Sequence, residues 1–222
     1  MAHPRVLILS LGNPAPYLNT LHSAGHHALA ALQPLLGPSQ TPFTSHRIES
    51  KATLASFGPR YVLYQSPSIM NVSGRWVQRA YRDLAASMAQ EAEALGLPPP
   101  PLHLLLVHDD LEEELGVVKV RKWTSSHRGH NGVKSVNASL KPAATGARFA
   151  RISIGIGRPK DRERESVSDY VLRDMTRHQQ TTLKETAGLG VLRCLEEWLA
   201  QDSGAKNAAA KDATVKEASA KA

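Results

Sequence analysis

The chain has 222 residues, of which 41% are hydrophobic, enough for one domain with a full core. Its formal net charge of +7 and a pI of about 9.7 favour a polyanionic partner such as a nucleic acid, because cations that neutralise phosphates release counterions. The single cysteine, Cys194, excludes an internal disulfide and a cysteine metal cluster.

The sequence has no segment suited to membrane insertion or export. No uninterrupted apolar run approaches the roughly 20 residues that a membrane-spanning helix requires. The first five residues lead straight into an apolar segment, which leaves no room for a signal or transit peptide. We therefore expect a cytoplasmic protein with no membrane partner, and we leave open whether a mitochondrial pool exists.

In the first half of the chain, apolar strands alternate with polar loops that lead into helices. Residues 6–11 are apolar except for Ser10, as in a short strand buried on both faces of a sheet. A helix with apolar residues at helical spacing follows and stops at Pro34. Residues 40–48 are polar and are expected to be irregular. Two strands joined by a tight turn are expected next, at 51–57 and 61–65. A helix around Trp76 to Met88 follows and ends by Gly96.

The second half of the chain begins with its strongest strand signal, residues 102–107, which runs into His108-Asp109-Asp110. A half-exposed strand is expected at 118–121, followed by a glycine- and serine-containing loop at 122–132 and a short helix at 133–140. A strand at 150–156 and a charged loop at 158–166 come next. The last elements are a short docking element at 169–172 and a helix at about 176–200. Residues 203–222 are rich in Ala and Lys and cannot bury enough surface to offset their ordering entropy. We expect a domain over 1–202 and a flexible or frayed-helical tail over 203–222.

These elements predict a single α/β domain with a central mixed, mostly parallel β-sheet flanked by helices on both faces. Open sheets of this class place their ligands at the carboxyl ends of the strands. Three polar loops are expected there, and they carry the candidate residues: Asn13, Tyr17 and His22; Met70 and Asn71; Asp109 with His130 and Asn131. A histidine held by a carboxylate can act as a general base on water, and asparagine amides can stabilise an oxyanion or hold a peptide. The set suits water attack on an activated ester.

Other chemistries find little support in the sequence. Residues 129–135 only faintly resemble a phosphate loop, because Val133 separates the glycine from the lysine. Gly155-Ile156-Gly157 lacks the third glycine of a dinucleotide fingerprint, and no Gly-x-Ser-x-Gly elbow occurs. The histidine pairs at helical spacing, His22/His26 and His127/His130, have no zincin glutamate. We therefore predict no cofactor and no metal.

Five motifs, in order and at compatible spacing over roughly residues 5–200, resemble the bacterial-type peptidyl-tRNA hydrolases. They are Leu11-Gly12-Asn13-Pro14 with Tyr17, Thr20, His22 and Gly25; Met70-Asn71-Val72-Ser73-Gly74; His108-Asp109-Asp110-Leu111; Gly129-His130-Asn131-Gly132-Val133-Lys134; and Arg151-Ile152-Ser153-Ile154-Gly155-Ile156-Gly157. The resemblance implies an enzyme that hydrolyses the ester joining a peptide to the terminal ribose of tRNA, so that tRNA is recycled in translation.

The resemblance also implies roles for individual residues. His22 matches the catalytic base of the family, and Asp109 matches the aspartate that orients it. Asn13, Asn71 and Asn131 match the asparagines that position the peptide, the terminal adenosine and the water. Tyr17 and His130 fall in the same motifs and are taken as substrate-binding, whereas Met70 would be an apolar wall or simply core.

The resemblance further implies a tRNA-binding surface for the acceptor stem and the CCA end. Lys119 and Arg121 match basic residues that clamp the 5′ phosphate, and the alternation of the strand puts both on one exposed face. Lys122, Arg128 and Lys134 are candidate extensions of this patch. A monomer is the family expectation.

The chain departs from the family pattern near His22. The family usually has Arg-His-Asn, where this chain has Leu21-His22-Ser23, so a hydroxyl replaces an amide. An alternative hypothesis is a non-catalytic RNA-binding or splicing protein on the same scaffold, but RNA binding alone requires neither His22 nor Asp109. A general small-ester hydrolase is a third hypothesis, which the basic face disfavours.

Overall fold

The structure is a computed structural model that describes residues 4–142 and 146–219, with side chains through Gln201. Its strands are β1 (Arg5–Ser10), β2 (Thr44–Ile48), β3 (Lys51–Phe57), β4 (Tyr61–Gln65), β5 (Leu102–Asp110), β6 (Val118–Lys122) and β7 (Phe149–Gly155). Its α-helices are α1 (Ala24–Leu32), α2 (Ser73–Ala94), α3 (Asn131–Ser139), α4 (Arg164–Leu172) and α5 (Arg177–Ser219). Short 3₁₀ turns are η1 (Tyr17–Asn19), η2 (Leu21–Ser23), η3 (Gln33–Leu36) and η4 (Met70–Val72).

The strands form one sheet in the order β2-β3-β4-β1-β5-β7-β6. The four central strands, β4, β1, β5 and β7, run parallel, and the antiparallel pairings lie at the two edges. The predicted mixed α/β sheet is therefore confirmed, with its parallel part confined to the centre. This arrangement brings the carboxyl ends of β1 and β5 side by side.

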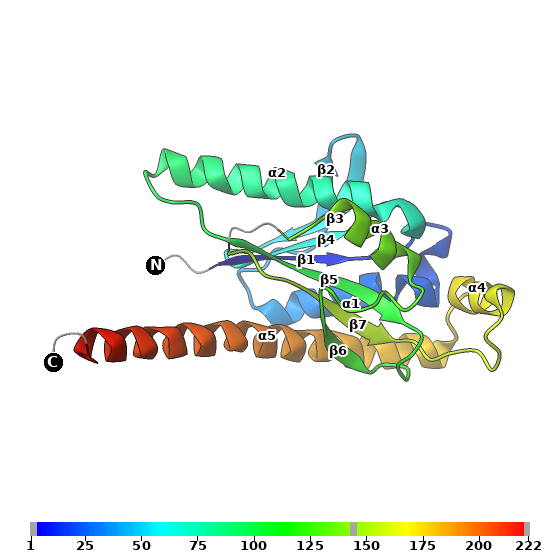
Figure 1. Cartoon of the computed structure of the whole chain (residues 1–222). Helices are drawn as coiled ribbons and strands as arrows, with labels where there is room; N and C mark the ends of the chain where they lie inside the picture. The colour runs from blue at the N-terminus through cyan, green and yellow to red at the C-terminus, as the bar shows by residue number, and fades with distance from the viewer. Residues whose placement is uncertain (1–3, 143–145, 220–222) are drawn as a thin grey trace.

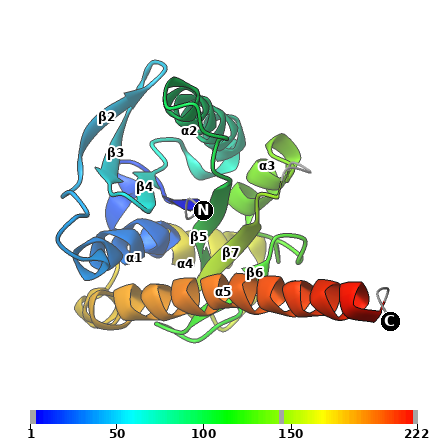
Figure 2. The same cartoon turned by 90° about the vertical axis from the view of Figure 1, so that its left-hand side faces the viewer.

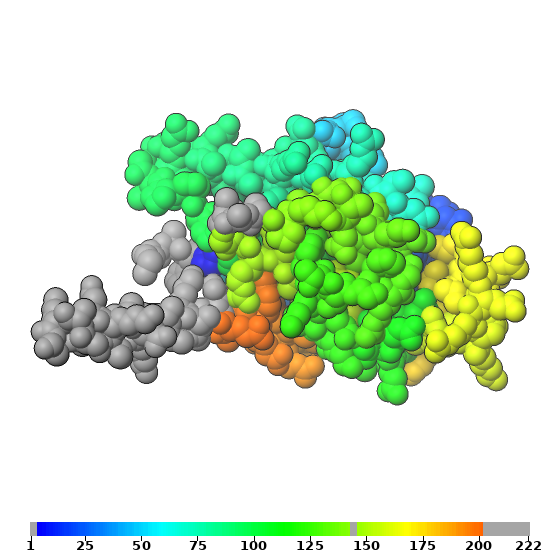
Figure 3. All heavy atoms as spheres, viewed as in Figure 1, coloured from blue at the N-terminus to red at the C-terminus, as the bar shows by residue number. Residues whose placement is uncertain are grey.

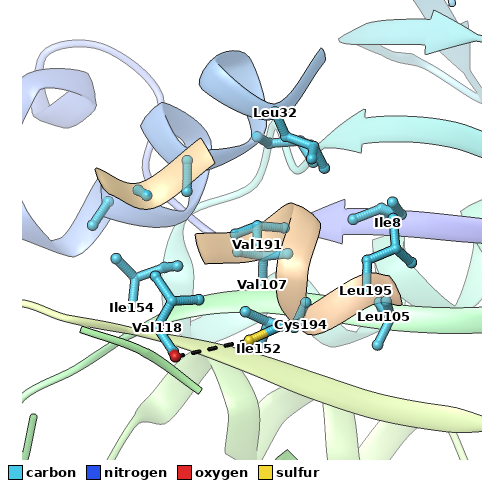
Figure 4. Close-up of a cluster of buried hydrophobic side chains, with 14 of the residues drawn as sticks. Ile8, Leu32, Leu105, Val107, Val118, Ile152, Ile154, Val191, Cys194 and Leu195 are labelled. Atoms are coloured by element: carbon cyan, nitrogen blue, oxygen red, sulfur yellow. Dashed lines mark hydrogen bonds between the residues drawn. The ribbon is translucent and has the colours of Figure 1, made fainter. Parts of the chain in front are cut away.

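Helices cover both faces of the sheet, as predicted (Figures 1 and 2). α1 and α5 pack on one face, and α2 and α3 pack on the other. Strand residues alternate between the two cores: Ile8 and Leu105 point toward α1 and α5, whereas Leu7 and Leu104 point toward α2 and α3. In Figure 4, Cys194 of α5 lies within the first core, where its Sγ is 3.8 Å from the carbonyl oxygen of Val118.

Two elements differ from the sequence prediction. Residues 44–48, expected to be irregular, form β2, an edge strand whose first four side chains are not buried and therefore give no apolar signal. Residues 164–172, expected as the end of a charged loop and a docking segment, form α4, in which only Val171 is buried. Both depend on pairing or packing with distant parts of the chain, which hydropathy does not report.

Toward the C-terminus, the backbone of α5 continues as helix to Ser219. Within the described residues, none of the helices has the length and apolar character needed to cross a bilayer.

Candidate active site

The loop after β1 and the end of β5 meet at the carboxyl edge of the sheet. Ser10 pairs with Val107, and the amide of Leu11 donates to the carbonyl of Val107 at 2.8 Å. α1 starts against this backbone: a Cβ on Gly25 would lie 2.5 Å from the carbonyl oxygen of Leu11, so only glycine fits. This close packing brings η2, which carries His22, to the end of β5.

His22 is hydrogen-bonded to Asp109, as the family resemblance implies. Its Nδ1 lies 2.9 Å from Oδ2 and 3.1 Å from Oδ1 of Asp109. Burial lowers the pKa of His22, but the charge of Asp109 and its hydrogen bond more than offset this, so the pKa is raised above the ordinary value. Because Nδ1–H donates to the carboxylate, the lone pair of the neutral ring is at Nε2. Asp109 thus fixes the tautomer that a general base needs.

Asp109 also accepts a hydrogen bond from a second histidine, His130, which the sequence placed only among substrate-binding residues. His130 Nε2 is 2.9 Å from Asp109 Oδ1, and its Nδ1 accepts from the amide of Val133 at 3.2 Å. His130 therefore caps α3 while it donates to Asp109. The rings of His22 and His130 are 5.1 Å apart.

The same three side chains could in principle coordinate a cation, since one ligand atom of each lies within 4.8 Å of the others. The hydrogen bonds favour a different use. His22 Nδ1 and His130 Nε2 both carry protons directed at Asp109, and a protonated ring nitrogen has no lone pair for a metal. Although burial raises the pKa of Asp109, the charges and hydrogen bonds of the two histidines hold it far below its usual range.

A third histidine, His108, lies behind this set and was not singled out in the sequence. Its Nδ1–H donates to the backbone carbonyl of Asp109 at 2.7 Å, and its ring stands edge-on to His130 at 5.0 Å. Its Nε2 is buried with no hydrogen-bond partner among the described residues. Burial, together with the charge of His130, lowers the pKa of His108 to about 3, so the ring is neutral at ordinary pH.

Hydrogen bonds from Asn13 join two of the predicted loops. Its Oδ1 accepts from the amide of Met70 at 2.9 Å, which leaves the Nδ2–H₂ group to donate elsewhere. The amide of Asn13 donates to Ser23 Oγ at 3.0 Å, and Ser23 Oγ donates to the carbonyl of Tyr17 at 2.8 Å. Ser23, the residue that departs from the family pattern, is fully buried and holds the loop together.

The remaining substrate-binding candidates differ in exposure. Met70 is only 2% exposed and packs in the core, where a Cβ on Gly132 would lie 2.4 Å from its Sδ. Tyr17, Asn71 and Asn131 are exposed. Two apolar residues that sequence reasoning missed, Ile69 and Val72, flank Met70 and Asn71 and are more than 60% exposed.

Comparison with known proteins agrees with this geometry. The family model for peptidyl-tRNA hydrolase matches residues 7–219. The chain belongs to the peptidyl-tRNA hydrolase family. It is 35% identical to the peptidyl-tRNA hydrolase of Geobacter sulfurreducens over 87% of this chain and 88% of that protein. It is 33% identical to a probable peptidyl-tRNA hydrolase of Schizosaccharomyces pombe over 75% of this chain and 69% of that protein.

Solved structures agree as well. A single-residue variant of peptidyl-tRNA hydrolase from Acinetobacter baumannii matches with a TM-score of 0.59 and 26% identity, over 82% of this chain and 84% of that chain. The family and fold expected from the five motifs are therefore confirmed.

In this member of the peptidyl-tRNA hydrolase family, the predicted phosphate-binding residues of β6 lie beside two acids. Lys119 Nζ is 2.6 Å from Glu113 Oε2, and the Arg121 guanidinium contacts Glu113 and, at 3.4 Å, Asp110. Arg128 lies 3.4 Å from Asp110 and 3.6 Å from Glu113. The shared acids show that Lys119 and Arg121 do point to one side of β6. The other two candidates, Lys122 and Lys134, are exposed.

Proposed function

We propose that the chain hydrolyses the ester between a peptide and the terminal ribose of tRNA, the activity that the names of its relatives state. The observation that carries the proposal is the pairing of His22 with Asp109 at the carboxyl edge of the sheet. Family membership sets the substrate class, and this pair supplies a general base without a side-chain nucleophile.

In the proposed reaction, His22 Nε2 removes a proton from a water molecule as the water oxygen attacks the ester carbonyl. The carbonyl oxygen gains negative charge, which the free Nδ2–H₂ of Asn13 can stabilise by hydrogen bonding. When the tetrahedral intermediate collapses, the bond to the ribose oxygen breaks and that oxygen takes the proton from His22. The products are the free peptide acid and a tRNA with a free terminal hydroxyl.

The other site residues have supporting roles in this proposal. Asp109 holds the tautomer of His22, and His130 keeps the second carboxylate oxygen of Asp109 occupied. Asn13, Asn71 and Asn131 would position the peptide, the terminal adenosine and the water. Asn71 and Asn131 are exposed, as is Tyr17, a further substrate-binding candidate. Met70 supports the loop as an apolar wall.

The finer assignments belong to the same proposal. Lys119, Arg121, Lys122, Arg128 and Lys134 would bind phosphates of the acceptor stem and the CCA end. We further propose that the chain acts as a monomer in the cytoplasm, through the domain at 1–202, with 203–222 as an accessory tail.

The test is release of free tRNA from an N-blocked aminoacyl-tRNA by the wild type and by His22→Ala. We expect turnover by the wild type and a loss on the order of 10² to 10⁴ in the variant, the usual contribution of a general base. A wild type that binds tRNA without turnover would favour the RNA-binding alternative. Full activity in His22→Ala would exclude the mechanism.

A further inference from the structure

Three arginines lie in the first half of helix α2. Arg75, Arg79 and Arg82 are spaced i, i+4 and i+7, which places them on one face of the helix. Buried residues of α2 such as Val77 and Met88 lie on the opposite face. All three arginines are exposed or half-exposed, and α2 runs along the upper surface of the molecule in Figure 3. We call these three residues the α2 arginine face.

Only one of these three arginines is paired within the part of the chain that the structure describes. Arg79 lies 2.7 Å from Asp83 and 3.3 Å from Glu49. Among residues whose side chains the structure describes, neither Arg75 nor Arg82 has an ion-pair or hydrogen-bond partner. In contrast, Lys119 and Arg121 of β6 and Arg128 of the loop after it are paired with Glu113 or Asp110. The α2 arginine face therefore has charge that is free to attract an external anion.

The stability of α2 does not explain this charge distribution. A helix is stabilised by acids in its first turn and bases in its last turn, because its N-terminus carries partial positive charge. α2 has no acid in its first turn and no base in its last, and Arg75 lies within that first turn. Glu93, next to the C-terminal end of α2, is also unfavourably placed, because that end carries partial negative charge. A local rule broken without an internal compensation is typical of a functional surface.

The α2 arginine face begins at the rim of the candidate active site. α2 starts directly after η4, which contains Asn71, and the amide of Gly74 donates to Ser135 Oγ of α3 at 3.0 Å. From Arg75 to Arg82 the helix rises by about 10 Å, enough to follow two or three nucleotides of one strand. A polyanion whose end occupies the site can therefore reach the α2 arginine face.

From these observations we propose that the α2 arginine face binds the phosphate backbone of the substrate tRNA, outside the part that enters the active site. The proposal rests on the proposed function, since tRNA is the polyanion that the site would hold. Arginine suits this role because its planar guanidinium matches phosphate oxygens and remains charged at any working pH. Such binding adds affinity without reading sequence.

The test compares Arg75→Ala/Arg82→Ala with a control that removes the same charge elsewhere. The control is Arg60→Ala/Lys184→Ala. Arg60 is exposed in the turn before β4, at the end of the parallel strands away from the active site. Lys184 is exposed on α5, which lies across the sheet from α2. We expect the α2 variant to raise the KM for N-blocked aminoacyl-tRNA about tenfold at roughly 150 mM salt with kcat unchanged. The log–log salt slope of tRNA binding should fall by about one for each phosphate that the variant no longer neutralises.

A minimal substrate, an N-acyl-aminoacyl-adenosine ester, separates binding from catalysis because it lacks the tRNA body. We expect the α2 variant to hydrolyse it at the wild-type rate. An unchanged KM and slope, an equal effect in the control variant, or equal loss on the minimal ester would each overturn the proposal. Uncharged tRNA binding, measured with the same variants, tests the surface even if the wild type shows no hydrolysis, so the two proposals can fail separately.

Discussion

His22 and His130 share the single carboxylate of Asp109, and this arrangement determines which of the two rings keeps a free nitrogen. Oδ2 and Oδ1 both approach His22 Nδ1, while Oδ1 also accepts from His130 Nε2. His130 is fixed from its other side by the amide of Val133, so it cannot turn toward a substrate without uncapping α3. His22 is the ring whose second nitrogen remains available, and this supports the proposal that His22 is the base.

The substitution Asp109→Asn tests this interpretation through pH. In the wild type, His22 must be neutral to accept a proton, so kcat/KM should rise with pH through a pKa that lies above the ordinary value. The substitution removes the charge that raises this pKa and leaves the burial that lowers it. We expect the inflection of kcat/KM to move to lower pH. The plateau of kcat/KM should fall by a factor on the order of 10² to 10⁴, since the asparagine amide no longer holds the tautomer of His22.

Asp110→Asn is the matched control, because Asp110 is the adjacent buried carboxylate and forms its ion pairs away from His22. It pairs with Arg121 and Arg128 instead. Measured on the minimal N-acyl-aminoacyl-adenosine ester, its pH profile should match the wild type. If both variants moved the inflection equally, the raised pKa would reflect general negative charge rather than the Asp109 hydrogen bond.

Residue types and motif spacing were sufficient to single out His22, Asp109 and Asn13 as candidates, because their chemistry is visible in the side chain itself. They were not sufficient for Ser23 or His108. Ser23 acts through two hydrogen bonds to the backbone of Asn13 and Tyr17, partners that only the folded loop brings together. In the sequence, His108 is simply one more polar residue at a strand end, and its neutral, buried state follows from packing against His130.

Among the elements, β5 carries Asp109, and the loop after β6 leads to His130 and Asn131. The apolar pattern predicts that β5 ends at Val107, but the strand continues to Asp110 because its last three residues still pair with β7. His108, Asp109 and Asp110 are thus held by a rigid strand rather than by a loop. Hydropathy alone marks the change in side-chain character, not the end of backbone pairing.

The loop after β6 depends on Arg151 of β7, an almost fully buried arginine. Its Nη2 donates to the carbonyls of Ser125 at 2.6 Å, Ser126 at 3.3 Å and Lys122 at 3.4 Å. Burial and the charge of Arg121 lower the pKa of Arg151, so these carbonyls help to stabilise a costly cation. The five motifs included Arg151, but its anchoring role follows only from the structure.

Arg151→Met should therefore loosen this loop rather than the whole sheet. The substitution removes the hydrogen bonds from a charged donor to the carbonyls of this loop, and we expect a decrease of about 1–3 kcal/mol in the free energy of unfolding. Hydrogen–deuterium exchange should rise in residues 122–128, and the KM for peptidyl-tRNA should rise more than kcat falls, since Arg128 lies in this loop. Arg151→Lys, which keeps the charge, should show a smaller change. Exchange that rises uniformly across β7 and β5 would instead indicate a purely structural core residue.

Across the whole molecule, net charge predicts a polyanionic partner but not where it binds. The excess of positive charge is distributed over several surfaces, and ion pairs cancel part of it locally. On β6 the acids Glu113 and Asp110 compensate the predicted clamp, whereas on α2 two arginines are uncompensated by the side chains that the structure describes. The alternation in β6 correctly predicted that Lys119 and Arg121 share a face. It could not predict Glu113, which reaches them from the turn between β5 and β6.

A cation that is paired with an acid can still bind phosphate if the phosphate replaces the acid. The competition between the acid and the phosphate is measurable. Lys119→Ala/Arg121→Ala should weaken tRNA binding and flatten its salt dependence, with turnover of the minimal ester near wild type. Glu113→Gln should do the opposite: it frees both cations, so tRNA should bind more tightly at low salt and with a steeper log–log slope. Filter binding of uncharged tRNA between about 50 and 200 mM salt measures both variants. Weaker binding in Glu113→Gln would mean that the acid positions the cations for phosphate rather than competing with it.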